Sequence, residues 1–341
     1  MASASNVVSI QMNTTFTFEL IADDTTWLAM KILMFGVTPT ISLFGIVGNI
    51  FSLHILTKHG LQKCSNILLV TLAFSDIMFL IGFNSVPKIL YQAAWDHEYR
   101  GLSELETRIL FALFCVFTVF DYTFGQMGLI LPMLITFERL VVIFLPLSFN
   151  RIITPPRTWL TVFGLFLYSL SIFIYSSFWS DITIYYDSIT NVSIETIGMS
   201  EYFYQNVDAA TALEEFMVYS CMIIPQWVTA FGCVVIFIKI KLSSIRRKNL
   251  TKKFVSTTRT TKMLLSVCCV YIVSSSILSL PNYIPQYASY SLTDDTQGNI
   301  NKVVYQLINT VVCINSSSNF IVYVVLNKNF RTTFLQLFHW L

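Results

Sequence analysis

The sequence predicts an all-α membrane protein, a seven-transmembrane helix bundle followed by a short amphipathic eighth helix. Three observations predict this fold. Of the 341 residues, 55% are hydrophobic and only 12% are charged, about half the charged fraction of an ordinary soluble domain. Seven apolar stretches are long enough to cross a bilayer, and basic residues gather on alternate connections between them. These charged residues are too few to cover the surface of a soluble protein of this size. We therefore expect the protein to lie in a lipid bilayer.

A helix that crosses about 30 Å of hydrocarbon needs roughly 20 mostly apolar residues, because every backbone polar group must be bonded within the segment. Seven stretches satisfy this length. They predict a transmembrane domain over 29–326, between an extracellular N-terminus (1–28) and a cytoplasmic eighth helix with a short tail (327–341). The expected spans are 29–57, 66–92, 108–143, 157–180, 213–242, 255–287 and 300–326.

Lysine and arginine side chains predict the orientation, because basic loop residues are retained on the cytoplasmic side. With an outer N-terminus, 16 of the 21 basic residues fall on the inner side and 16 of the 19 acidic residues on the outer side. We therefore expect a plasma-membrane protein with its C-terminus in the cytoplasm. Two sequons, at Asn13 and Asn191, fall on the outer side, where glycans could be attached. The seven cysteines have no zinc-like spacing, so no metal site is expected.

Polar side chains inside three of the spans predict a buried network, since ionisable groups in hydrocarbon are costly and usually functional. Asp76 lies midway along the second span, Asn49 follows Gly48 in the first, and Asn315 and Asn319 lie one helical turn apart in the seventh. One carboxylate and three carboxamides at similar depth could surround water or a sodium ion. Polar attachment of one helix to another is the alternative interpretation.

The third span carries a polar residue toward each side of the membrane. Asp121 and Arg139 are 18 residues apart, which is about five helical turns, so they project from one face about 27 Å apart. Arg139 adjoins Glu138 at the inner end. We expect Asp121, together with Tyr122 and Gln126, to contact an extracellular ligand. The alternative for Asp121 is a carboxylate kept neutral by burial or bonded to a neighbouring tyrosine or serine.

Six short motifs occur along the spans, each once. In chain order they are Gly48-Asn49, Leu72-Ala73-Phe74-Ser75-Asp76, Glu138-Arg139-Leu140 followed by Pro146-Leu147, Pro225, Asn319-Phe320-Ile321-Val322-Tyr323 and Phe330-Arg331. Together they resemble the motifs of the rhodopsin-like (class A) G-protein-coupled receptors, across all seven spans. The resemblance implies an extracellular ligand and a heterotrimeric G protein as partners. It also implies that activation and coupling involve Glu138, Arg139, Pro146, Asn319 and Tyr323.

Two segments indicate a subfamily. Ser316-Ser317-Ser318-Asn319-Phe320, with phenylalanine in the usual proline position, and the opening of the sixth span at 260–265 are similar to invertebrate FMRFamide-type neuropeptide receptors and related nematode chemoreceptors. Asp121 falls where amine and some peptide receptors of the family hold a cationic nitrogen. Retinal proteins of the family need a lysine in the seventh helix, and none lies between Lys302 and Lys328.

The chain also departs from the family's pattern. Cys115 lies near the usual position of a disulfide to the second outer loop, but 176–219 contains no cysteine, so we expect no disulfide. The sixth span, at 271–277, lacks the usual phenylalanine, tryptophan and proline. Cys233 stands eight residues after Pro225, where the family has a tyrosine that helps to hold the active state.

We therefore expect a G-protein-coupled receptor for an extracellular cationic ligand, most readily a neuropeptide, because the outer side is strongly acidic. A biogenic-amine or small-molecule chemosensory receptor is the alternative within this fold. An ion-coupled transporter or channel is the alternative of another class, although the sequence shows no repeated halves or rings of charge. No enzyme activity is expected, since the four histidines lie at membrane borders, in loops or in the tail. The lipid bilayer is an expected partner, nucleic acid is not, and sodium is the one candidate cofactor.

Overall fold

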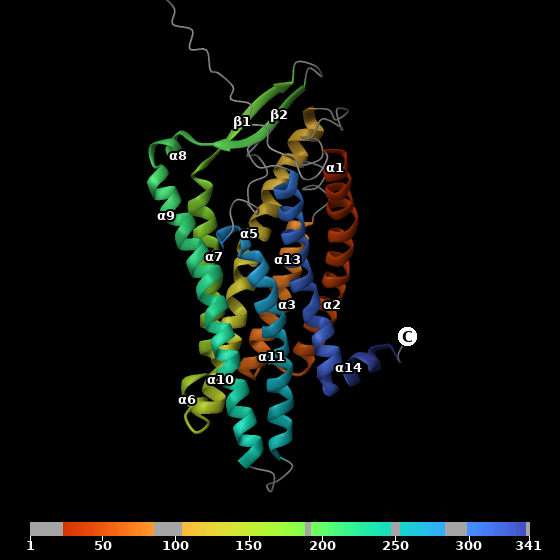
Figure 1. Cartoon of the computed structure of the whole chain (residues 1–341), viewed down its shortest axis with the longest axis vertical. Coiled ribbons are helices and arrows are strands. Elements are labelled where there is room, and N and C mark those ends of the chain that lie inside the picture. Colours follow the sequence, from red (N-terminus) through yellow and green to blue (C-terminus); the bar gives the residue numbers. More distant parts are fainter. Residues whose placement is uncertain (1–22, 85–103, 188–191, 247–252, 284–298, 339–341) are drawn as a thin grey trace, which may run out of the picture.

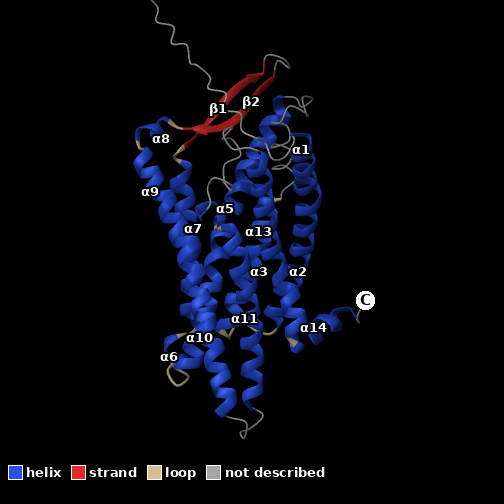
Figure 2. Ribbon diagram, viewed as in Figure 1, coloured by secondary structure: helices blue, strands red, loops and turns tan. Residues whose placement is uncertain are grey.

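Long helices run side by side and form one elongated bundle, with a β-hairpin at one end and a short helix at the other (Figure 1). The computed structural model describes residues 23–84, 104–187, 192–246, 253–283 and 299–338. Within these ranges nearly everything except the hairpin is helical (Figure 2).

The elements follow the order of the apolar stretches in the sequence. The helices are α1 (Asp23–Lys31), the π-helix η1 (Ile32–Val37), α2 (Thr38–Lys58), α3 (Cys64–Phe83), α5 (Glu104–Phe144), α6 (Phe149–Ile152), α7 (Pro155–Ser177), α8 (Glu201–Gln205), α9 (Val207–Met217), the π-helix η2 (Val218–Ile223), α10 (Ile224–Arg246), α11 (Lys253–Leu278), α12 (Leu280–Tyr283), α13 (Asn299–Leu326) and α14 (Lys328–Phe338), and the strands are β1 (Ser180–Asp187) and β2 (Val192–Met199).

Six helical segments in the described ranges are long and apolar enough to cross a membrane. They are Asp24–Lys58, Cys64–Phe83, Arg108–Phe144, Pro155–Ser177, Val207–Leu242 and Ile300–Leu326. The remaining expected span, 255–287, corresponds to α11, whose apolar part Leu264–Leu278 is shorter. Its helix ends before Pro281, and 284–287 lie outside the described residues. The predicted all-α membrane architecture is confirmed.

Two of the spans contain a π-helical turn just before a proline. In η2 the N–H of Ile224 donates to the carbonyl of Tyr219, five residues earlier, and Pro225 follows directly. The same arrangement precedes Pro39 in η1. A proline ring clashes with the carbonyl four residues before it and offers no N–H. Widening the helix by one residue per turn therefore accommodates the ring while the helix continues.

Helices α3 and α5 form the centre of the bundle. Of the most apolar stretch of α3, 67% is buried inside the protein, against 22% for α7. The two central helices approach each other closely at Gly82, where a Cβ atom would lie 2.5 Å from the backbone nitrogen of Asp121 and 2.7 Å from the carbonyl of Phe117. No residue larger than glycine fits there without moving a helix, so Gly82 fixes the position of Asp121.

The β-hairpin covers one end of the bundle. Its strands are antiparallel, with Ser180 opposite Met199 at the base. Ser200 closes this base, because its N–H donates to the carbonyl of Trp179 at 3.0 Å and its hydroxyl donates to the carbonyl of Phe178 at 3.0 Å. Strand β2 lies against α5. The hairpin therefore connects α7 to α8 above the end of the central helix.

Candidate functional site

An ion pair closes the α14 end of the bundle. Glu138 and Arg139 are neighbours near the end of α5, and Nη2 of Arg139 lies 2.9 Å from Oε2 of Glu138. Both side chains are buried, with 8% of Arg139 and 3% of Glu138 exposed. A buried ion pair is costly to break, because each charge loses its partner in a medium that solvates it poorly. The guanidinium is thus held inside the protein.

Ser65, in the first turn of α3, is the third member of this network. Its hydroxyl donates a hydrogen bond of 2.7 Å to Oε1 of Glu138 and accepts one from Nη2 of Arg139. The network therefore attaches the end of α5 to the beginning of α3. The sequence analysis identified Glu138 and Arg139 but missed Ser65; its one signal is a hydroxyl in the first turn of a span, at the same end as Arg139.

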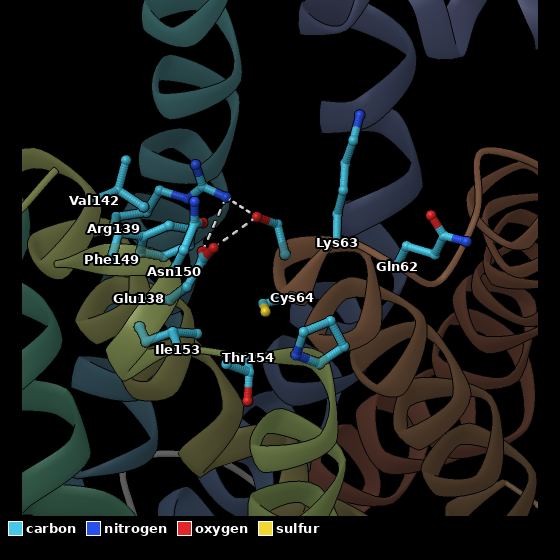
Figure 3. A pocket seen from close by; sticks show the side chains of 12 residues that line it. Gln62, Lys63, Cys64, Glu138, Arg139, Val142, Phe149, Asn150, Ile153 and Thr154 are labelled. Carbon is cyan, nitrogen blue, oxygen red and sulfur yellow. Dashed lines mark hydrogen bonds and ion pairs between the residues drawn. The ribbon is translucent and has the colours of Figure 1, made fainter. Parts of the chain in front are cut away.

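A cavity of about 460 Å³ adjoins the network (Figure 3). Its walls come from the start of α3, the end of α5, α6 and the start of α7. Figure 3 shows Glu138 and Arg139 on one side and Gln62 and Lys63 on the other, with the thiol of Cys64 between them. The arrangement places a pocket with both polar and apolar walls beside the buried guanidinium.

A second polar cluster lies deeper in the bundle. Nδ2 of Asn319 donates a hydrogen bond of 2.7 Å to Oδ2 of Asp76, and both residues are buried, at 5% and 2% exposure. Nδ2 of Asn49 donates at 2.8 Å to the carbonyl of Ser316. These bonds connect α2, α3 and α13. Three of the four residues expected in the network thus meet at the same helix junction.

Asn315, the fourth residue, turns to a different helix. Its Oδ1 accepts a hydrogen bond of 2.9 Å from the hydroxyl of Ser274 on α11. Three buried oxygens near the Asp76 junction, on the same helices, have no hydrogen-bond partner among the described residues: Asn49 Oδ1, Ser75 Oγ and Tyr323 Oη. Buried oxygens of this kind usually bind ordered water or an ion.

Phe320, which stands in the usual proline position, is the centre of an aromatic cluster. Its ring centroid lies 5.2 Å from that of Phe334 and 6.2 Å from those of Phe51 and Phe330. Asn327 starts α14 by accepting a hydrogen bond of 3.2 Å from the N–H of Phe330. The departure from proline therefore joins α2, α13 and α14 through packed rings.

Asp121, Tyr122 and Gln126, near the middle of α5, have different surroundings. The half-buried Asp121 interacts electrostatically with Tyr305 on α13, a residue that the sequence analysis missed. The Tyr122 side chain is 51% exposed, and its ring lies 6.0 Å from that of Phe173 on α7. Gln126 is 7% exposed, and neither atom of its amide has a partner among the described residues. Asp121 therefore interacts electrostatically with Tyr305 on α13 and also with its neighbour Tyr122.

Side-chain hydrogen bonds join the sixth span to its neighbours where the usual aromatic and proline residues are missing. Gln226, directly after Pro225, donates 2.9 Å to the hydroxyl of Ser276 and accepts 3.0 Å from that of Ser279. The hydroxyl of Thr136 on α5 lies 3.4 Å from the sulfur of Cys268. Polar contacts thus connect α11 to both α10 and α5.

The remaining predicted residues are at the surface or outside the described ranges. Pro146 follows the end of α5 and is exposed, and the next residue, Leu147, is fully exposed. Asn13 and Asn191 lie outside the described residues. All seven cysteines lie within the described ranges, and no disulfide joins any two of them there.

A family model described as "Serpentine type 7TM GPCR chemoreceptor Srw" matches residues 36–341, which is most of the chain. The chain belongs to this family. It is therefore a multi-pass, G-protein-coupled chemosensory receptor and not an enzyme, as predicted. The Srw assignment supports the resemblance to nematode chemoreceptors, and it does not place the receptor among the rhodopsin-like families specifically. No curated protein matches the Srw receptor's sequence.

Proposed function

We propose that this receptor binds a cationic extracellular ligand, most readily a peptide, at the hairpin end of its bundle and activates a heterotrimeric G protein at the α14 end. The observation that carries the proposal is the position of Asp121 and Arg139 on one central helix. Asp121 lies near the middle of α5, Arg139 lies near its α14 end, and the guanidinium is held by Glu138 and Ser65. The N-terminus is then outside the plasma membrane and the C-terminus inside.

The ligand end supplies negative charge. Of the 19 acidic residues in the sequence, 16 fall on the proposed outer side, and a surface of that sign attracts cations. Asp121 offers a carboxylate beside Tyr305, and Gln126 offers a buried amide without a partner among the described residues. A positively charged group on the ligand would pair with Asp121, and an amide or carbonyl of the ligand would satisfy Gln126. Tyr122 would contribute through its exposed ring.

Activation would release the guanidinium at the other end. The closed network pairs Arg139 with Glu138 and Ser65 and so holds it away from a G protein, which means that the resting arrangement favours an uncoupled receptor. A ligand that binds an arrangement with α11 moved outward more tightly than the closed one shifts the population toward it. Arg139 would then contact the G protein, assisted by the exposed Pro146-Leu147 turn and by the basic stretch between 239 and 262.

The Asp76 junction would couple the two ends. Asp76, Asn319 and Asn49 connect three helices, and the unpartnered oxygens beside them support a water-filled or sodium-filled centre. Tyr323 belongs to α13 at the same junction, so a rearrangement there would reach the α14 end. Asn315, which bonds to α11, would respond to movement of that helix.

A small-molecule or amine ligand is the second candidate, favoured by the description of the family as chemoreceptors. A G-protein reporter assay in cells can separate the two, with amidated cationic peptides, biogenic amines and neutral odorant-like molecules as separate sets. We expect a cationic agonist, and Asp121→Asn should weaken its potency by at least about tenfold, equal to about 1.4 kcal/mol. Surface expression should stay the same. An anionic agonist, or wild-type potency in the variant, would contradict the proposed role of Asp121.

Orientation and glycosylation have their own measurements. An epitope at the N-terminus should be stained in intact cells, whereas one at the C-terminus should need permeabilised cells. If Asn13 and Asn191 carry glycans, an endoglycosidase lowers the apparent mass, and replacing both asparagines by glutamine removes that shift.

A further inference from the structure

The cavity beside Arg139 has the volume of a small-molecule site. Its volume, about 460 Å³, falls within the range of small-molecule pockets, roughly 300–1,000 Å³. One wall is the closed network itself, since Ser65, Glu138 and Arg139 all line it. Whatever occupies the cavity therefore contacts the residues proposed to control coupling.

The lining is positively charged. Of the twelve described residues that surround the cavity, Lys63 and Arg139 are basic and only Glu138 is acidic. Glu138 is already paired with Arg139 and accepts a bond from Ser65. The charge left without a protein counterion in the lining is thus a cation, at Lys63. Beside the α6–α7 wall, Arg157 adds a further positive charge, held by hydrogen bonds from Nη1 to the carbonyls of Arg151 (2.7 Å) and Ile152 (3.1 Å).

Two kinds of buried donor face this cavity. The Arg139 side chain is 8% exposed, and its Nε has no hydrogen-bond partner among the described residues. Helix α3 begins at the cavity with Cys64 and Ser65, and the N-cap residue Lys63 supplies no side-chain acceptor. The first N–H groups of a helix lack partners within the helix and favour an anion. The N–H of Asn66 already donates to the carbonyl of Lys63 at 2.9 Å, so the donors proposed for an oxyanion are Nε of Arg139 and the N–H groups of Cys64 and Ser65.

Apolar side chains form another part of the wall. Val142 from α5, Phe149 and Ile153 from the α6 segment, and Pro155 at the start of α7 also line the cavity, and Figure 3 shows Val142 and Phe149 on the same side as Arg139. A bare phosphate would leave this apolar surface uncovered. A phosphate attached to an apolar group would cover both parts. That combination is the chemistry of a phospholipid.

We propose that this cavity binds the phosphorylated headgroup of an anionic phospholipid from the cytoplasmic leaflet. Basic pockets between transmembrane helices on the cytoplasmic side are suited to phosphoinositide headgroups. The phosphate accepts from Nε of Arg139 and the start of α3 and is paired with Lys63. The glycerol end lies against Val142 and Phe149. This assignment rests on the orientation proposed above, which places the cavity in the cytoplasmic half.

The bound headgroup favours the closed receptor. The cavity has its present wall only while Ser65, Glu138 and Arg139 are bonded to one another. A ligand that contacts this wall binds the closed arrangement more tightly and lowers the population of the open one. Removal of the lipid raises basal coupling.

Binding is tested with full-length purified receptor in phosphatidylcholine discs, with phosphatidylinositol bisphosphate as the probe lipid. Lipid retention is measured by native mass spectrometry. Wild type retains the probe lipid, and Lys63→Gln lowers its affinity about fivefold, the effect of one basic residue near an anionic group. Val142→Phe lowers the affinity by filling the cavity without any change of charge. Lys328→Gln, which removes the same charge from exposed α14, retains the lipid as wild type does.

Two further comparisons distinguish a lipid phosphate from a soluble one, and the lipid site from the proposed G-protein function. Soluble inositol trisphosphate shares the headgroup of the probe lipid, so the lipid assignment requires it to bind more weakly than the lipid does. Inositol trisphosphate that binds as tightly as the lipid, with the same dependence on Lys63 and Val142, overturns the lipid assignment and identifies a soluble anion. Equal lipid retention by Lys63→Gln, Val142→Phe and wild type overturns the site.

Basal nucleotide exchange on a purified G protein is lower with the probe lipid, and Lys63→Gln removes that difference. Retention without an effect on exchange overturns the closed-state role alone, and a receptor that never supports exchange contradicts the proposed function while the binding result stands. Unchanged thermal unfolding of the variants in phosphatidylcholine discs establishes that they are folded.

Discussion

Phe320 fills the space that a side chain at residue 48 would need: a Cβ atom on Gly48 would lie 2.9 Å from Cβ of Phe320. The two residues belong to α2 and α13, far apart in the sequence. Glycine in the first span and phenylalanine in the usual proline position are therefore one structural feature. The same ring also packs against Phe334 and Phe330, which belong to α14.

Gly48→Ala should destabilise the receptor by about 1–3 kcal/mol, the usual effect of inserting a methyl group into a packed interface. The thermal unfolding midpoint of purified receptor measures the change. Gly164→Ala on α7 is the matched control, because a Cβ atom there meets nothing within 4 Å. Adding Phe320→Ala to Gly48→Ala should remove most of the steric clash, so Gly48→Ala should lower the unfolding midpoint less in the Phe320→Ala background than in wild type. Equal midpoints for Gly48→Ala and Gly164→Ala would show that the contact tolerates a methyl group.

Ser65→Ala should raise basal nucleotide exchange by about fivefold to tenfold. The variant removes a donor to Glu138 and an acceptor for Arg139, and hydrogen bonds to charged groups contribute about 1.5 kcal/mol or more. Exchange on a purified G protein without ligand is the measurement. Ser171→Ala is the control, since that exposed hydroxyl bonds to the carbonyl of Tyr168 in its own helix. Basal exchange at the wild-type level would mean that Ser65 does not hold the closed state.

Sodium should stabilise the wild-type receptor relative to choline at equal ionic strength, and Asp76→Asn should abolish the difference. The carboxylate supplies the negative charge that a cation needs, and the nearby oxygens of Asn49 and Ser75 lack partners among the described residues. Thermal unfolding in the two salts measures the effect. Asn315→Ala should keep the sodium effect, because Asn315 bonds to Ser274 on α11. A sodium effect that survives Asp76→Asn would place the ion elsewhere or exclude it.

The fold and the main polar positions could be predicted from the sequence, because span length and basic residues report directly on the bilayer. The pairing of Asp76 with Asn319 followed from their similar depth in the spans. The contact of Asn315 could not be predicted in this way. Asn315 lies one helical turn before Asn319 on α13, and there its side chain reaches Ser274 on α11 instead of Asp76. Adjacent residues on a helix point about 100° apart, which explains why Tyr122 turns toward α7 while Asp121 approaches α13.

Other features carried too little signal in the sequence. Ser65 is a common residue in a common position, and only the folded chain shows that it lies beside Glu138. The β-hairpin between α7 and α8 consists of two short strands, and short alternating stretches are hard to distinguish from loop. Leu147 was identified only as part of a motif, and its full exposure is a property of the folded turn.

The central claim is that Arg139, held by Glu138 and Ser65 in the resting receptor, is the group through which the receptor activates its G protein. Nucleotide exchange on a purified G protein, catalysed by wild-type receptor and by Arg139→Ala at equal amounts in the same discs, tests it most directly. The account predicts that Arg139→Ala reaches the cell surface and stays folded at the assay temperature, with a lower unfolding temperature because Glu138 loses its buried partner, yet gives no exchange above background with or without agonist. Exchange by Arg139→Ala at the wild-type rate would contradict it.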